Sequence, residues 1–427
     1  MAVTLESDGH SLPVHKALAA GLRVLEPTAA SVLFRDFLSL HPGRSLAAST
    51  KHLDATMNWL CRAQDACGGY GVASGYSLID GWESPYPEVT GYIIPTFYDY
   101  AALTGREEFC VRARRMADWE IDVQLPSGAV QAGLYNPRNT ENRWPAVFNT
   151  GQVILGWCRA FTETQDQRYV DAAIRAAAWL IRLQAQDGSW NLESPITQTV
   201  VHAYDVRTAW SLIELSCLIN ESRYSEAARR NVEWTLKQQE ENGWFLNNSF
   251  FKSNVTFTHN IGYVMEGILG FWHNLKEHRY LEAVQRTADR LLRIFELRQF
   301  MAGDFDPSWK GNARYSCLTG DAQIAGTWLR LFEETGDVRY LNGALKLSDY
   351  VKGTQGVHVL NPGIRGGVKG SHPIAGSYTP FTYVSWGAKF LADSLMLEER
   401  LMAALERELL AGQRHERSNN GALKTRS

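Results

Sequence analysis

The chain has 427 residues, of which 45% are hydrophobic and 21% charged, and its formal net charge is −3. This composition is typical of a water-soluble globular protein. It offers neither a generally basic surface for nucleic acids nor an apolar run long enough to span a membrane. We therefore expect no nucleic-acid partner and no membrane span. The N-terminal residues lack the charged and then apolar plan of a secretory signal, so the expected location is cytoplasmic.

A repeat of roughly 55 to 60 residues runs through the chain. Arg-Tyr pairs recur at intervals of 55, 56 and 60 residues, beginning at Arg168, Arg223, Arg279 and Arg339. Tryptophans recur at intervals of 60, 60 and 55 residues, at Trp59, Trp119, Trp179 and Trp234. Each unit is long enough for two helices and an elaborated loop, so six units account for nearly the whole chain.

Apolar periodicity divides each unit into two kinds of helix. Amphipathic helices, expected on the outside, are predicted at 44–66, 106–124, 167–186, 223–240, 279–297 and 338–352. Helices with few charges in their bodies, expected inside, are predicted at 88–103, 149–163, 204–219, 259–275, 321–334 and 383–398. Antiparallel pairing of the two kinds predicts an all-α fold, an (α/α)6 toroid of six helical hairpins.

We place the toroid at residues 44–402. Residues 1–43 are predicted to form an N-terminal extension that packs on the barrel, and residues 403–427 a C-terminal helix end with a disordered tail. No segment within 44–402 has the Pro/Ser-rich composition of a linker between domains, so we expect a single toroid.

The connections are of unequal length. Inner-to-outer connections are short and contain glycines suited to a helix C-cap, such as Gly105 and Gly336. The outer-to-inner loops are long, and all should share one end with the N-termini of the inner helices, where binding residues concentrate. The Gly-rich loop from Gly363 to Gly376 is expected to cover the cleft, with Arg365 and Lys369 meeting acidic groups of a substrate.

The six cysteines lack the paired spacing of metal sites, so we expect no metal and no cofactor. The turns at 184–190 and 238–244 resemble the Gln…Gly-Trp turns of triterpene cyclases. The acidic Asp-x-Asp-Asp proton donor of those enzymes is missing, since the stretch 304–308 does not reproduce it. A terpenoid-handling toroid therefore remains only an alternative.

The first turns of the inner helices are unusually polar. Glu88, Asp205 and Asp321 are candidate catalytic carboxylates, because hydrolysis of a glycosidic bond needs one acid and one base or nucleophile. The competing interpretation is that acids near helix N-termini only cap the helix or complement its dipole.

A second mechanism is open at the same helix starts. His259 and Tyr263 are candidate catalytic groups of a uronate lyase or C5-epimerase, which remove a proton from the sugar ring. Amides, aromatic rings and other polar groups suited to sugar recognition complete the predicted substrate-binding set: Tyr92, Asn149, Gln152, His202, Tyr204, Arg207, Trp244, Asn260, Gln323, Tyr383, Trp386 and Arg365.

Four strings carry a family resemblance: Pro-Glu-Val-Thr-Gly-Tyr-Ile-Ile-Pro-Thr-Phe at 87–97, Asn-Thr-Gly-Gln-Val at 149–153, Thr-His-Asn-Ile-Gly-Tyr at 258–263 and Trp-x-x-Lys-Phe-x-Ala-Asp at 386–393. They resemble an (α/α)6-toroid family of bacterial polysaccharide-biosynthesis loci, and the likeness spans most of residues 45–400. More distantly, the architecture resembles toroid glycoside hydrolases, polysaccharide lyases and uronyl C5-epimerases.

These observations predict an enzyme that acts on an oligosaccharide or polysaccharide, most simply by hydrolysis with paired carboxylates at the inner-helix N-termini. Uronate lyase or C5-epimerase chemistry is the alternative within enzymes. A non-catalytic glycan-binding protein of polysaccharide assembly is the alternative outside them, and it would have assembly proteins as partners.

Overall fold

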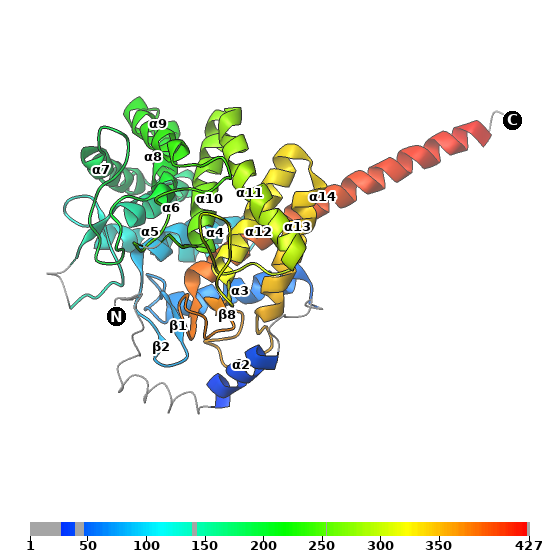
Figure 1. Ribbon diagram of the computed structural model, residues 1–427, viewed down its shortest axis with the longest axis horizontal. Helices are drawn as coiled ribbons and strands as arrows, with labels where there is room; N and C mark the ends of the chain where they lie inside the picture. Colours follow the sequence, from blue (N-terminus) through cyan, green and yellow to red (C-terminus); the bar gives the residue numbers. More distant parts are fainter. Residues whose placement is uncertain (1–26, 39–46, 139–142, 253, 425–427) are drawn as a thin grey trace.

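A computed structural model describes residues 27–38, 47–138, 143–252 and 254–424 (Figure 1). The inner helices are α4 (Pro87–Thr104), α6 (Val147–Thr164), α8 (Val206–Ile219), α10 (Thr258–Leu275), α12 (Leu318–Thr335) and α14 (Ser385–Lys424). The outer helices are α3 (Ser49–Asp65), α5 (Glu108–Val123), α7 (Gln167–Leu183), α9 (Ser222–Lys237), α11 (His278–Arg298) and α13 (Val338–Thr354). One further helix, α2 (Pro27–Leu38), precedes them.

The inner helices form a closed ring. Each packs on the next, from α4 through α6, α8, α10 and α12 to α14, and α14 packs back on α4. Five hairpins pair an inner helix with the outer helix that follows it, and the sixth pairs the last inner helix, α14, with the first outer helix, α3. The predicted all-α (α/α)6 toroid is confirmed.

The helix ends follow the local chemistry of the sequence. Five inner helices end on a residue in the left-handed conformation whose N–H bonds back into the last turn: Gly105, Gln165, Asn220, Lys276 and Gly336. The outer helices α7 and α13 begin after an aspartate whose carboxylate accepts the N–H of the second helical residue. Short turns therefore gather at one end of the ring.

The Arg-Tyr repeat links neighbouring outer helices. The Tyr169 hydroxyl of α7 contacts Asp118 of α5 at 3.0 Å, and that of Tyr340 in α13 contacts Asp289 of α11 at 2.8 Å. Three of the repeated tryptophans, Trp59, Trp179 and Trp234, pack into the core, whereas Trp119 is half-buried. The repeat signal therefore reports how adjacent hairpins are joined.

The long loops occupy the opposite end of the ring and carry short strands. The strand β1 (Gly75–Ser77) pairs antiparallel with β2 (Gly81–Trp82) and with β9 (Thr382–Val384), so the first and last long loops of the ring are joined. Three more antiparallel pairings among the described residues join β3 (Val130–Gln131) to β4 (Pro145–Ala146), β5 (Thr256–Phe257) to β6 (Asp304–Phe305), and β7 (Ser316–Cys317) to β8 (Ser371–His372). Figure 1 shows β1, β2, β8 and α2 together at this end.

The helices near the two ends of the chain, α2 and α14, add features to the ring of six hairpins. Asp36 of α2 accepts a hydrogen bond from Lys369 Nζ at 2.6 Å, which ties α2 to the Gly-rich loop. The helix α14 continues beyond the ring as a single helix to Lys424 (Figure 1). The proposed division of the chain at 43 and 402 stays a prediction, and residues 1–26, 39–43 and 425–427 of those segments lie outside the described residues. Within the described part of the chain, no helix has the length and apolar character needed to cross a membrane.

Candidate functional site

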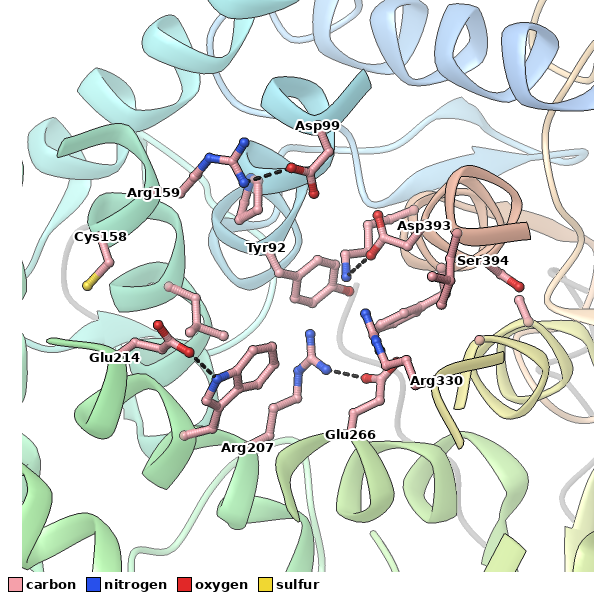
Figure 2. Close-up of a pocket in the computed structure, with 18 of the residues that line it drawn as sticks. Tyr92, Asp99, Cys158, Arg159, Arg207, Glu214, Glu266, Arg330, Asp393 and Ser394 are labelled. Carbon is pink, nitrogen blue, oxygen red and sulfur yellow. Dashed lines mark hydrogen bonds and ion pairs between the residues drawn. The ribbon is translucent and has the colours of Figure 1, made fainter. Parts of the chain in front are cut away.

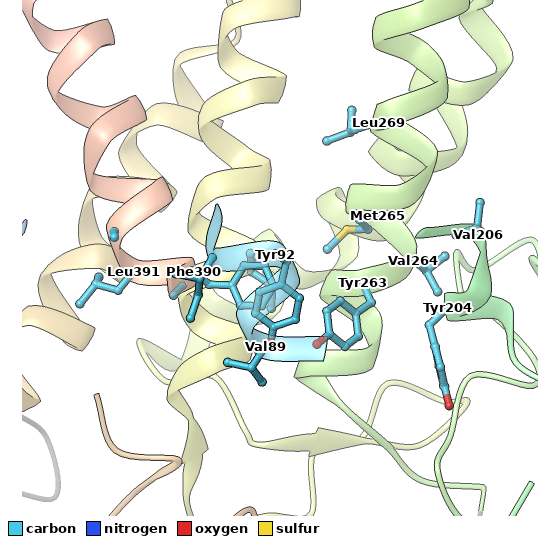
Figure 3. Close-up of a cluster of buried hydrophobic side chains, with 14 of the residues drawn as sticks. Val89, Tyr92, Tyr204, Val206, Tyr263, Val264, Met265, Leu269, Phe390 and Leu391 are labelled. Carbon is cyan, nitrogen blue, oxygen red and sulfur yellow. The ribbon is translucent and has the colours of Figure 1, made fainter. Parts of the chain in front are cut away.

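Two cavities at opposite ends of the ring are lined by the described residues of the inner helices. The loop-end cavity, about 200 Å³, lies at the N-termini of the inner helices. The turn-end cavity, about 350 Å³, lies further along the same helices, on the side of the short turns. Between them stand Tyr92 of α4, Tyr263 of α10 and Phe390 of α14, whose ring centroids are 5.7 Å apart for Tyr92 and Phe390 and 5.9 Å apart for Tyr263 and Phe390 (Figure 3). These aromatic rings separate the two cavities.

One position of the inner helices lines the loop-end cavity repeatedly. It is the second helical residue of α4, α6, α10 and α14: Glu88, Phe148, His259 and Trp386. The residue four positions later projects from nearly the same face of the helix, one turn further on, because an α-helix turns about 100° per residue. Tyr263 of α10 and Phe390 of α14 occupy this later position. The repeat therefore places chemically different side chains at equivalent points around one cavity.

Glu88 is the only carboxylate that lines the loop-end cavity among the described residues. Burial raises its pKa to about 7, although hydrogen bonds with Tyr86 and Tyr263 and the charge of Arg207 act in the opposite direction. Glu88 is itself partly exposed to the cavity. A carboxyl group with a pKa near neutrality can either accept or donate a proton under ordinary conditions.

His259 is held by a chain of hydrogen bonds. Its Nδ1 lies 2.7 Å from Gln323 Oε1, and Gln323 Nε2 donates to Glu266 Oε2 at 3.3 Å. Because the amide nitrogen of Gln323 faces Glu266, its oxygen faces His259, so Nδ1 carries the proton and Nε2 is the acceptor. Burial and the charge of Arg207 together lower the pKa of His259 to about 3, although the hydrogen bond with Gln323 acts in the opposite direction. The imidazole is therefore neutral at neutral pH.

Arg207 completes this network beneath the cavity. It is 3% exposed, its Nε donates to Gln152 Oε1 at 2.6 Å, and it forms an ion pair with Glu266. The guanidinium also lies 5.4 Å from the centroid of the Tyr263 ring. Arg207 lies two residues from Asp205 in the sequence, but its ion pair is with Glu266, and Asp205 lies beside His202.

Aromatic rings form much of the remaining wall. The rings of His259 and Tyr263 are 4.1 Å apart, and Phe148 lies 4.6 Å from Tyr263. Trp386 Nε1 donates to the Tyr378 hydroxyl at 2.9 Å, which fixes the indole at the rim. Rings arranged around polar groups provide the surface that sugars require, with apolar faces for ring C–H groups and donors for hydroxyls.

The other two predicted catalytic carboxylates do not line the loop-end cavity. Asp205 is buried with its Oδ2 3.6 Å from His202 Nδ1, and burial raises its pKa. Asp321 is fully buried, accepts a hydrogen bond from Ser316, and has its pKa raised by burial to about 8. The structure thus brings Glu88, His259 and Tyr263 together and leaves these two acids outside.

Of the predicted substrate-binding residues, Asn149, Tyr204 and Trp386 line the loop-end cavity. Asn149 donates to the carbonyl oxygen of Gln131 at 2.9 Å, which orients its amide. His202 lies behind Tyr204, with its ring stacked on the tyrosine at 4.6 Å. The imidazole of His202 therefore supports the cavity wall.

The remaining predicted residues lie elsewhere. Gln152 and Gln323 belong to the network below the cavity, and Tyr92 and Arg207 line the turn-end cavity. Asn260 and Tyr383 are buried, and Trp244 packs edge-on against Trp309. Arg365 is exposed on its loop. Lys369, expected to meet a substrate, instead makes a buried ion pair with Asp36, because α2 covers it.

Sequence reasoning missed Glu266 and Tyr378. Glu266 is a buried carboxylate inside an otherwise apolar helix body, from Ile261 to Leu269, and that isolated charge was a usable signal. Tyr378 reaches the cavity from the Gly-rich loop, where no periodicity reports the direction of a side chain. Within the described residues, no group of three or more His, Cys, Asp or Glu side chains is placed to hold a metal ion.

The fold has several solved counterparts. An unsaturated glucuronyl hydrolase specific for heparin is 14% identical, with a TM-score of 0.65 over 83% of this chain and 98% of its own. Cellobiose 2-epimerase from Bacillus thermoamylovorans is 12% identical, with a TM-score of 0.61 over 80% and 98%. A polysaccharide lyase is 12% identical, with a TM-score of 0.57 over 84% and 99%. The chain therefore has the toroid fold shared by sugar hydrolases, sugar epimerases and polysaccharide lyases.

A narrower match comes from sequence. Residues 149–321 match the Ulvan lyase N-terminal domain family, over less than half of the chain. No curated protein has a significantly similar sequence. The predicted distant resemblance to toroid glycoside hydrolases, lyases and epimerases is thus confirmed, with the family match on the lyase side.

Proposed function

We propose that this protein acts on a uronic-acid-containing oligosaccharide or polysaccharide by removing the proton at C5 of the uronate, with β-elimination as the outcome. The observation that supports this proposal best is the loop-end cavity itself. It combines one carboxyl group with a pKa of about 7, a neutral histidine, a tyrosine and an amide, and it has no second carboxylate among the described residues.

In this proposal Glu88 is the base. Its carboxylate takes the C5 proton, and its pKa near neutrality suits that task. The bond between C4 and its glycosidic oxygen then breaks, a C4–C5 double bond forms, and the leaving oxygen takes the phenolic proton of Tyr263. Because Glu88 and Tyr263 both line the cavity, the proton gained by Glu88 can return to the phenolate and restore both groups.

Three further residues assist. Asn149 is the candidate partner of the uronate carboxylate, since an amide hydrogen bond to that group makes the C5 proton more acidic. The lone pair on His259 Nε2 accepts a hydrogen bond from a sugar hydroxyl, with the ring fixed through Gln323. Arg207 lies below the cavity, ion-paired with Glu266, and its guanidinium lies 5.4 Å from the centroid of the Tyr263 ring, so it helps to position that phenol.

The expected hydrolysis by paired carboxylates has less support. It requires two acids across one glycosidic bond, and of the three candidates only Glu88 faces the loop-end cavity. The names of the similar proteins agree with a uronate substrate and with lyase chemistry, since they include a glucuronyl hydrolase, a polysaccharide lyase and the Ulvan lyase domain. The cytoplasmic location and the link to polysaccharide assembly remain predictions.

The test is an incubation of neutral and uronic-acid oligosaccharides in deuterated water, followed by mass spectrometry, proton NMR and ultraviolet absorbance. Elimination yields a conjugated double bond at the new non-reducing end. We expect this product from the wild type and at least an approximately hundredfold slower rate from Glu88→Gln and Tyr263→Phe, in line with the usual contribution of general acid–base catalysis.

Matched controls are Asp205→Asn and Tyr350→Phe, which change an acid and a phenol that do not line the cavity. Deuterium at C5 without cleavage would make the protein an epimerase that uses the same first step. New reducing ends without unsaturation would refute the proposal in favour of hydrolysis. Binding of the oligosaccharides with no reaction would favour the glycan-binding alternative.

A further inference from the structure

The turn-end cavity is a second polar chamber that the proposed reaction does not use. Its volume of about 350 Å³ lies within the usual range of small-molecule sites. The side chain of Asp99 near its mouth is 50% exposed, whereas Arg207 and Glu266 at its floor are 3% and 7% exposed. The cavity therefore runs from the surface down to the network beneath the loop-end cavity (Figure 2).

The charges in this cavity are balanced. Four cationic side chains and four carboxylates line it: Arg159, Arg207, Arg330 and Lys389, with Asp99, Glu214, Glu266 and Asp393. Most of these groups already have partners inside the protein. Arg159 pairs with Asp99 at 2.7 Å, Lys389 pairs with Asp393 at 2.6 Å, and Arg207 pairs with Glu266. A ligand with a net charge would disturb this balance.

Arg330 and Ser394 are among the polar groups on the wall that lack such partners in the described part of the chain. Arg330 of α12 has no hydrogen bond or ion pair within 4 Å to a described residue, and Figure 2 shows its side chain between Asp393 and Glu266. Ser394 of α14 is 2% exposed, and its hydroxyl has no hydrogen-bond partner in the described part of the chain. Buried polar groups normally find partners, so Ser394 marks a place for a ligand atom, and the half-buried guanidinium of Arg330 is open to a second one.

Gly326 creates the space beside these two groups. It lies within α12, where glycine costs helix stability relative to alanine. A Cβ atom there would meet Ser394 at 3.7 Å, an ordinary van der Waals contact. No steric demand of the helix packing explains this glycine, in contrast with Gly91, whose Cβ would lie 2.7 Å from the Cα atom of Val153. A longer side chain at 326 would occupy the cavity.

We propose that the turn-end cavity binds a neutral sugar unit. A hydroxyl group both donates to carboxylates and accepts from guanidinium groups, so a polyhydroxylated ring matches a wall on which the two alternate. Its oxygens would accept from Arg330, and its hydroxyls would pair with Ser394 and Asp99. This site is distinct from the loop-end cavity, and the proposal does not rest on the C5 proton chemistry.

The experiment measures binding of D-glucose, D-galactose, D-mannose and L-rhamnose to the full-length protein by calorimetry and ligand-observed NMR. We expect at least one of these sugars to bind, and D-glucuronate and D-glucosamine to bind more weakly. Gly326→Leu, which fills the cavity, should weaken binding at least about tenfold, and Arg330→Gln should also weaken it. Hydrogen exchange should slow on binding around Gly326 and Arg330 in α12 and between Lys389 and Leu397 in α14.

The matched controls are Gly326→Ala, whose methyl group fits, and Arg290→Gln, which removes an exposed arginine outside the cavity. Both should bind as the wild type does, and so should Glu88→Gln. The proposal fails if none of the neutral sugars binds, if Gly326→Leu with a wild-type melting temperature binds normally, or if Glu88→Gln abolishes binding. Should Gly326→Leu not fold, Arg330→Gln decides the question in the same way.

Discussion

Asp321 gives a prediction whose size can be worked out from its surroundings. The carboxyl group is fully buried at the start of α12, its Oδ2 accepts a hydrogen bond from Ser316, and its Oδ1 has no partner among the described residues. Burial raises its pKa from 3.8 to about 8. Asp321→Asn keeps the shape and the contact with Ser316 but removes the ionisable group.

The sign follows from proton binding. Between about pH 4 and about pH 8 the folded protein holds the Asp321 proton, whereas the unfolded chain has released it. The free energy of unfolding therefore falls as the pH rises, by up to about 1.4 kcal/mol per pH unit, and the contribution of this group at pH 7 reaches about 4 kcal/mol at most. Asp321→Asn should lose this dependence and become more stable than the wild type as the pH rises.

Urea unfolding of both proteins across that pH interval measures the difference. Asp337→Asn is the control, because Asp337 caps α13 at the surface and hydrogen bonds with Arg339 lower its pKa, so its effect on the slope has the opposite sign. A constant difference between the wild type and Asp321→Asn at every pH would show that Asp321 is ionised in the folded protein, and the reasoning would be wrong. Loss of activity in this variant would instead restore its predicted catalytic role.

Three further predictions each concern one buried residue. Glu120 is fully buried with no partner for either oxygen in the described structure, and burial raises its pKa. Glu120→Gln should therefore raise the melting temperature at neutral pH more than at about pH 4.5, and an equal rise at both pH values would contradict this. Gly91→Ala should cost about 1 to 3 kcal/mol in urea unfolding, because the new Cβ meets the α6 backbone, and wild-type stability would refute the close packing. Gln323→Leu should lower the free energy of unfolding by about 1 to 3 kcal/mol, because it leaves His259 Nδ1–H unpaired. The same variant should lower kcat, and Gln323→Glu should partly restore it. An unchanged pH–rate profile would show that Gln323 does not position His259.

The fold could be predicted because the repeat is redundant. Twelve ring helices were located from period and amphipathicity, and each begins near its predicted residue. The sequence periodicity could not predict features that lie outside the repeat. The helix α2 occurs once, and the extension of α14 to Lys424 continues through residues that are too polar to indicate a buried helix.

The predicted site residues at the inner-helix starts share one end of the ring, but only some of them face the loop-end cavity. Rotation around the helix explains the difference. His259 is the second residue of α10, whereas Asp321 is the fourth of α12, and two residues correspond to about 200° of rotation. Asp321 therefore faces away, while Gln323, two residues further on, returns to the side of His259. Helix starts known only to within a few residues cannot separate these cases.

The pairing of α3 with α14 has a consequence for how the protein is made. Ser49 Oγ donates to Glu398 Oε1 at 2.7 Å across 349 residues of sequence. During synthesis the first outer helix leaves the ribosome long before its partner, the last inner helix, so the growing chain is an open arc with two uncovered edges. The ring can close only after α14 has left the ribosome. A chain that stops before Ser385 would leave both edges exposed at once, with the apolar surfaces of two separate hairpins free to aggregate.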